Sequence, residues 1–68
     1  FRGISNSGDY CTVVGNSVHD TRGNSRMDIC IYVPGNNNVV VANVTSGSSG
    51  GDNIYISGTG NIEGNNKE

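Results

Sequence analysis

The sequence predicts an all-β fold, in the form of a β-solenoid of about three coils, and three observations support this prediction. The first is composition: the 68 residues include 11 Gly, 11 Asn, 8 Ser, 8 Val and 6 Ile, but no Leu. Val and Ile favour strands, whereas Gly, Asn and Ser favour turns. The other two observations are short motifs that recur together, as expected of stacked repeats. Helical and doubly wound folds are excluded because the strongest helix formers are almost absent.

The first recurring motif is a short aliphatic strand followed by a glycine turn. It is clearest in residues 31–35 (IYVPG) and 54–58 (IYISG), and residues 4–8 (ISNSG) form a weaker copy. Aliphatic side chains alternate with other residues along these segments, which is typical of a strand with one buried face. The side chains expected to face the core are Ile31, Val33, Ile54 and Ile56.

The aromatic residues of the same motif are expected on the opposite face. Tyr32 and Tyr55 occupy equivalent positions in successive copies. If the copies pair as neighbouring parallel strands, these side chains stack about 4.8 Å apart on the outside. The same alternation predicts that Cys30 points outward with Tyr32, and that Cys11 points inward with Val13.

The second recurring motif is a strand that ends in asparagine. It occurs at residues 13–16 (VVGN), 40–43 (VVAN) and 62–65 (IEGN), with offsets of 27 and 22 between copies. The first motif keeps nearly the same offsets, 27 and 23, so both motifs share one register. The expected inward residues are Val13, Val40 and Ile62, and the outward positions include Glu63.

Each copy of the second motif places an asparagine at a corner. Asn tolerates left-handed backbone angles and can hydrogen-bond within its own turn. When such residues stack in register, their amides can also bond to one another along the stack. The predicted structural ladder consists of Asn16, Asn43 and Asn65. Residues 43–45 (NVT) also form a glycosylation sequon. If Asn43 is buried in the ladder, its side chain cannot be glycosylated.

The two motifs organise the chain as a single segment of three coils, at about 1–27, 28–51 and 52–68. Variable loops close the first two coils. Repeating units of this length that consist only of strands and turns describe β-solenoid coils. An antiparallel sandwich of short strands is the alternative. We expect the segment to be an uncapped fragment of a longer protein.

Charge, hydrophobicity and cysteine content limit the function classes. The net charge is −2 without a basic patch, which disfavours nucleic-acid binding. No apolar run is long enough to form a membrane-spanning helix. Cys11 and Cys30 are too few for a disulfide framework, and with the single His19 they fit no zinc pattern. We expect two free thiols, with a Cys11–Cys30 bridge as the alternative, and neither metal nor cofactor.

The run from Ile31 to Thr45 (IYVPGNNNVVVANVT) resembles one coil of a pectin-lyase-like right-handed parallel β-helix. That superfamily includes pectate lyases, polygalacturonases, and phage tailspikes and appendages. The resemblance extends over essentially all 68 residues. It implies three short parallel sheets, an Asn ladder in the turn after the second strand, and a variable third turn.

The candidate site residues are acids, arginines and tyrosines. Asp28 and Asp52 each precede the first strand of a coil and would lie about 5 to 8 Å apart, within range of an acid–base pair. The alternative is that each aspartate closes a turn by bonding nearby backbone amides. No signature of the polygalacturonases or pectate lyases is present, so no catalytic residue is assigned. The candidate glycan-binding residues are Arg22, Arg26, Tyr32 and Tyr55.

The resemblance implies a segment of a phage tailspike or appendage protein that binds host surface polysaccharide, at the virion surface or extracellularly. Its partners would be other coils of the same protein or sister chains in a homotrimer. One alternative is a non-catalytic portion of a bacterial polysaccharide lyase or epimerase. The other is a purely structural or adhesive solenoid.

Overall fold

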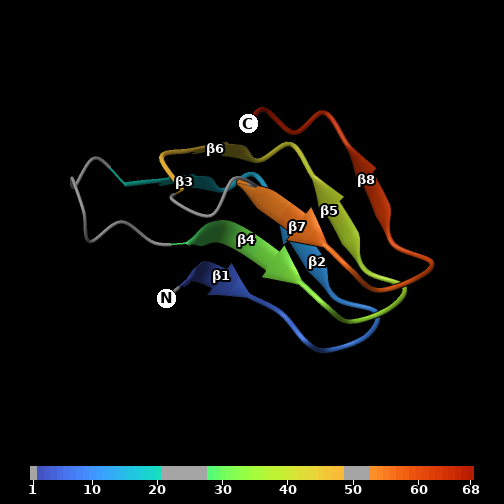
Figure 1. Cartoon of the computed structure of the whole chain (residues 1–68). Coiled ribbons are helices and arrows are strands. Elements are labelled where there is room, and N and C mark those ends of the chain that lie inside the picture. Colours follow the sequence, from blue (N-terminus) through green and yellow to red (C-terminus); the bar gives the residue numbers. More distant parts are fainter. Residues whose placement is uncertain (1, 21–27, 49–52) are drawn as a thin grey trace.

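The computed structural model describes residues 2–20, 28–48 and 53–68, and these residues contain strands and turns but no helix. The strands are β1 (Arg2–Ser5), β2 (Thr12–Val14), β3 (Ser17–His19), β4 (Ile29–Val33), β5 (Val39–Val41), β6 (Val44–Ser46), β7 (Ile54–Ile56) and β8 (Ile62–Gly64). They form three sheets, in the orders β1–β4–β7, β2–β5–β8 and β3–β6, whose strands lie side by side (Figure 1). The all-β prediction is confirmed.

Every strand pair in these sheets is parallel and joins strands three places apart in the chain. Ile4 pairs with Ile31, and Ile31 pairs with Ile54, so the offsets are 27 and then 23. The antiparallel alternative is therefore wrong for the described strands. We refer to segments 1–27, 28–51 and 52–68 as repeats one, two and three.

The hydrophobic core lies between the sheets and is centred on repeat two. Ile31, Val33 and Val40 are fully buried there, and Val13 of repeat one is 7% exposed. Partly buried aliphatic residues from the outer repeats pack against this cluster, namely Ile4, Val18, Ile54 and Ile56. The predicted inward positions of the first motif are confirmed. Repeat two is the most buried because it has a neighbouring repeat on both sides.

The register of β8 corrects the prediction for the second motif. Val40 pairs with Glu63, and Val39 pairs with Ile62. Ile62 is 64% exposed rather than inward, and Glu63 occupies the position equivalent to Val13 and Val40. The offset between repeats two and three is therefore 23 residues in sheet β1–β4–β7 and also in sheet β2–β5–β8. The offset of 22 expected for the second motif is one residue too short.

The physical reason for the one-residue difference is a turn that requires left-handed backbone. The residue after each strand of this sheet has positive φ: Gly15 (71°), Ala42 (58°) and Asn65 (54°). Asn65 fills this conformational position, which Asn accepts more readily than most residues. Asn65 is therefore not a ladder residue, and Asn66 occupies the ladder position instead.

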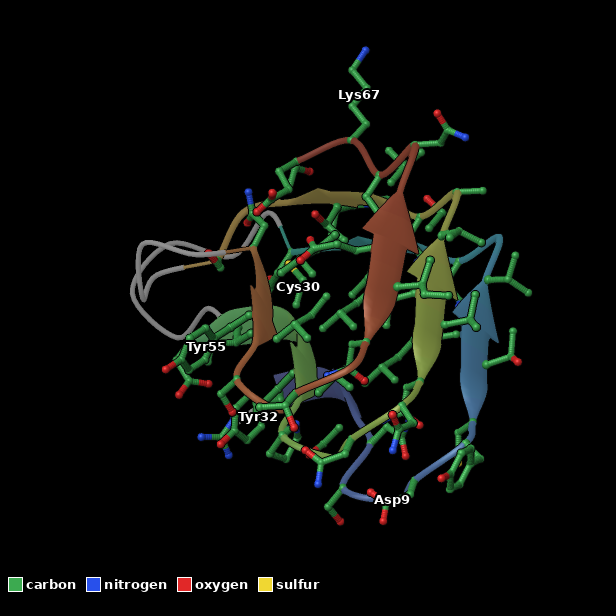
Figure 2. The ribbon with its side chains drawn as sticks, turned by 90° about the vertical axis from the view of Figure 1, so that its right-hand side faces the viewer. Asp9, Cys30, Tyr32, Tyr55 and Lys67 are labelled. Atoms are coloured by element: carbon green, nitrogen blue, oxygen red, sulfur yellow. The ribbon has the colours of Figure 1, made fainter. Side chains whose placement is uncertain are left out.

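The orientation predicted for Cys30 is also wrong. Cys30 is fully buried, and Figure 2 shows it between the sheets rather than on the outer face with Tyr32. Its Sγ donates a hydrogen bond to the carbonyl oxygen of Ser46 (3.3 Å). The N–H groups of Cys30 and Ile31 both donate to the carbonyl of Asn53, at 3.0 and 2.9 Å. Because two consecutive residues share one acceptor, the alternation of faces is interrupted and both side chains are buried.

The two free thiols are expected to differ in reactivity. Burial and the nearby Asp20 carboxylate raise the pKa of the Cys30 thiol, against the opposing effect of the Ser46 hydrogen bond. Because the thiolate is the nucleophile, Cys30 should react about tenfold more slowly, or slower still, than the half-buried Cys11 with a disulfide reagent such as Ellman's reagent. The Cys11→Ser variant should show only the slow phase, and denaturant should abolish the difference. Equal native rates for both thiols would contradict the burial of Cys30.

Candidate functional site

The described residues form an aromatic column on the outer face of sheet β1–β4–β7. Tyr32 pairs with Tyr55 in the strand register, and their rings stack with centroids 5.7 Å apart and planes at 17°. Figure 2 shows both tyrosines on the outside of this sheet. The predicted outward stack is confirmed.

Arg2 extends this column on the side opposite to Tyr55. Its Cζ lies 4.5 Å from the centroid of the Tyr32 ring, which is within the range of a cation–π contact. Because β4 lies between β1 and β7, Arg2 and Tyr55 lie on opposite sides of Tyr32. Sequence reasoning missed Arg2, since no motif marks it and only the pairing of β1 with β4 brings it to Tyr32. We call Arg2, Tyr32 and Tyr55 the aromatic column.

The remaining predicted site residues are Arg22, Arg26, Asp28 and Asp52. Arg22, Arg26 and Asp52 lie outside the described residues, so their candidate roles remain predictions. Asp28 lies just before β4, and its Oδ1 accepts a hydrogen bond from the Ile29 N–H (3.1 Å). This bond is of the turn-closing type that was the alternative to an acid–base role.

Asn43 forms the centre of the predicted amide ladder. It is fully buried, and its Oδ1 accepts hydrogen bonds from the N–H (3.0 Å) and the Nδ2 (3.1 Å) of Asn16. Its Nδ2 donates to the carbonyl of Val13 (3.0 Å) and to Oδ1 of Asn66 (2.9 Å). The ladder is therefore confirmed for Asn16 and Asn43, and its third member is Asn66 instead of Asn65. The sequon at residues 43–45 is structural, because the Asn43 amide is fully buried in these bonds.

A second amide ladder closes the turn after the first strand, and sequence reasoning missed it. Asn38 is fully buried, accepts a bond from the Cys11 N–H (2.7 Å), and donates Nδ2 to the carbonyl of Gly8 (2.9 Å). Asn61 repeats this pattern against the Asn38 N–H (2.7 Å) and the Gly35 carbonyl (3.0 Å). The offsets between repeats align positions 11, 38 and 61 and could have revealed this ladder.

In both ladders an asparagine of one repeat closes a turn of the preceding repeat. The Oδ1 atom accepts the N–H at the equivalent position one repeat earlier, and Nδ2 donates to a carbonyl three residues before that position. This explains why Cys11 is tolerated in the first ladder position: the asparagines of later repeats supply the bonds. The ladders are part of the scaffold that holds the outer faces in place.

No family model, curated protein or solved structure matches this chain. Among the described residues, no group of three or more His, Cys, Asp or Glu is placed to hold a metal ion. The described part of the chain also contains no helix long and apolar enough to cross a membrane. The aromatic column is therefore the feature on which we base a functional proposal.

Proposed function

We propose that the three sheets are the faces of a right-handed parallel β-helix with about three coils. The support is that each strand pairs in parallel with the strand three places later, with one register across two sheets. Connections between parallel strands of one sheet are almost always right-handed, which gives the proposed hand. A crystal structure of the chain would test both the continuous winding and its direction.

We also propose that the chain is a segment of a phage tailspike or appendage protein that binds host surface polysaccharide. Such a protein would act at the virion surface or extracellularly, with other coils or sister chains of a homotrimer as its neighbours. The single observation that carries the binding proposal is the aromatic column on the outer face of sheet β1–β4–β7.

The geometry of the column indicates which group would contact the sugar. One face of the Tyr32 ring lies under Arg2 and the other faces Tyr55, so Tyr32 mainly supports its neighbours. Tyr55 is 44% exposed. An aromatic ring combines an apolar face with a polar hydroxyl, which suits the apolar face and hydroxyl edge of a sugar ring. The Arg2 guanidinium adds a positive charge that favours an acidic sugar, because arginine bonds carboxylates in a bidentate manner.

The proposal predicts that Tyr55→Ala weakens polysaccharide binding by about tenfold or more, since a stacking contact is worth on the order of 1 kcal/mol beyond the buried area. Affinity electrophoresis in gels containing polygalacturonate, with dextran as the neutral comparison, would measure the effect. Arg2→Gln should reduce binding to the acidic polymer more than to the neutral one.

Tyr10→Asn is the matched control. Tyr10 is the most exposed tyrosine, at 82%, and lies in a bend between β1 and β2. Its φ of 57° matches that of Asn37 (59°), so asparagine is already accepted at the equivalent turn position. This variant should bind within about twofold of wild type. Equal losses for Tyr10→Asn and Tyr55→Ala would contradict the proposed face, and a wild-type chain that binds nothing on a glycan array would favour a purely structural role.

A further inference from the structure

We propose that Ser5 determines the chemical character of the aromatic column and, through it, the preference for acidic over neutral polysaccharide. Ser5 leaves one face of the Tyr32 ring open, and the Arg2 guanidinium occupies that face instead of a third aromatic ring. The inference deepens the proposed polysaccharide binding and rests on it for the preference, whereas the place of Arg2 can be tested without any ligand.

Ser5 occupies the position in β1 that tyrosine occupies in the next two repeats. It pairs with Tyr32 in the strand register, and Tyr32 pairs with Tyr55 in the same way. Ser5 is exposed, and its side chain belongs to the outer face because its neighbour Ile4 packs against the core. Ser5 and the two tyrosines therefore form one row across the outer face of sheet β1–β4–β7.

The size of the side chain in this row decides what covers the Tyr32 ring. Tyrosines in register stack on each other, as Tyr32 and Tyr55 do with ring centroids 5.7 Å apart. Serine carries only a hydroxyl beyond its β-carbon, so Ser5 cannot cover the ring from its own strand. The Arg2 Cζ lies over the ring instead, 4.5 Å from its centroid. A tyrosine at position 5 would place its ring in the space that the guanidinium fills.

The group that covers Tyr32 matters for ligand choice because a guanidinium and an aromatic ring bind different parts of a sugar. A guanidinium forms charge-assisted hydrogen bonds with a carboxylate, which only acidic sugars carry. A third ring would offer another apolar face and hydroxyl, which suit neutral and acidic sugars alike. By leaving room for Arg2, Ser5 therefore shifts the preference of the column toward acidic sugars.

The first measurement needs no ligand and locates the Arg2 side chain by NMR. In the wild-type chain, a nuclear Overhauser contact is expected between the Arg2 side-chain protons and the Tyr32 ring protons, because the two groups are in contact. Ser5→Tyr should abolish this contact and introduce one between the Tyr32 ring and the added ring. Ser5→Ala should retain the wild-type contact, because the small size of residue 5 matters and its hydroxyl does not.

The second measurement is the selectivity, which is the ratio of the affinities for polygalacturonate and dextran in affinity electrophoresis. Ser5→Tyr should lower this ratio by about threefold or more, as expected for the loss of one exposed charge contact. Arg2→Gln should lower it equally, and the double variant should lower it no further, because Ser5→Tyr already displaces Arg2 from the Tyr32 ring. Ser7→Tyr is the matched control: it adds the same side chain at an exposed position two residues farther along and should keep the wild-type ratio.

The proposal is overturned if Ser5→Tyr, with a wild-type circular dichroism spectrum, retains the contact between Arg2 and Tyr32. It is also overturned if Ser5→Tyr leaves the selectivity unchanged while Arg2→Gln lowers it, or if Ser7→Tyr lowers it equally. A wild-type chain that binds neither polymer refutes the proposed function and the preference together, and the NMR contact then still decides what covers Tyr32. Should Ser5→Tyr fail to fold, Ser5→Leu also covers the ring, and the same loss of contact and of selectivity is expected of it.

Discussion

Gly35→Ala is expected to destabilise the fold by about 3 kcal/mol or more, because an added β-carbon has no space. The β-carbon would fall on the carbonyl oxygen of Gly8, 2.9 Å from its carbonyl carbon and 3.0 Å from the carbonyl carbon of Ser7. These are backbone atoms of the neighbouring repeat, so relief requires that the two repeats separate. Chemical denaturation followed by circular dichroism would measure the loss.

Gly64→Ala is the matched control for this prediction. A β-carbon on Gly64 would meet no atom within 4 Å, and its backbone is not in the left-handed region. The substitution reduces the entropy of the unfolded chain without strain, so its effect should stay within about 0.5 kcal/mol or be slightly stabilising. Similar losses for Gly35→Ala and Gly64→Ala would contradict the close approach of Gly35 to the Gly8 carbonyl.

Asn43→Ala is expected to cost about 3 kcal/mol, because each buried polar group left unsatisfied costs about 1 to 3 kcal/mol. The substitution leaves the N–H and amide of Asn16, the carbonyl of Val13 and the Oδ1 of Asn66 without their partner in a fully or partly buried place. Some of the freed groups can reach water at the ends of the ladder, which keeps the total below the sum of the separate costs. The free energy of unfolding would again be the quantity measured.

Two substitutions at the end of the ladder test its register. Asn66→Ala should be clearly destabilising, since Asn66 accepts from the Asn43 N–H (3.0 Å) and donates to the Val40 carbonyl (2.9 Å). Asn65→Gly should be nearly neutral, because Asn65 is exposed and its φ of 54° suits glycine. The reverse order of effects would restore the register in which Asn65 is the ladder residue.

The repeating plan of the chain could be predicted because its evidence is local. Composition indicated strands and turns, and two motifs that recur at nearly matching offsets indicated which segments pair. The stack of Tyr32 on Tyr55 and the contact of Asn16 with Asn43 followed directly from that pairing. The Asn38 ladder has the same spacing between repeats. Its first position holds Cys11 instead of an asparagine, so the three positions do not stand out as a repeated residue type.

The predicted register of the last strand is wrong because residues of different identity adopt the same backbone conformation at the turn. Residues 62–65 (IEGN) match the earlier copies of the motif by their glycine and asparagine, but the turn requires only a residue that accepts positive φ. Gly15, Ala42 and Asn65 all meet that requirement, and the alignment by identity therefore moved the predicted ladder by one residue. The same shift exchanged the predicted faces of Ile62 and Glu63.

The sequence by itself determined that this is an all-β chain of repeating strands, because composition and spacing are properties of the chain alone. The tertiary structure decided which side chain faces inward at each irregular point, since that depends on hydrogen bonds between repeats. Because the N–H groups of Cys30 and Ile31 share the Asn53 carbonyl, the Cys30 side chain lies in the core. The pairing of Val40 with Glu63 places a charged residue in register with a buried valine. The approach of Arg2 to Tyr32 is likewise set by the neighbouring strand and leaves no pattern in the sequence.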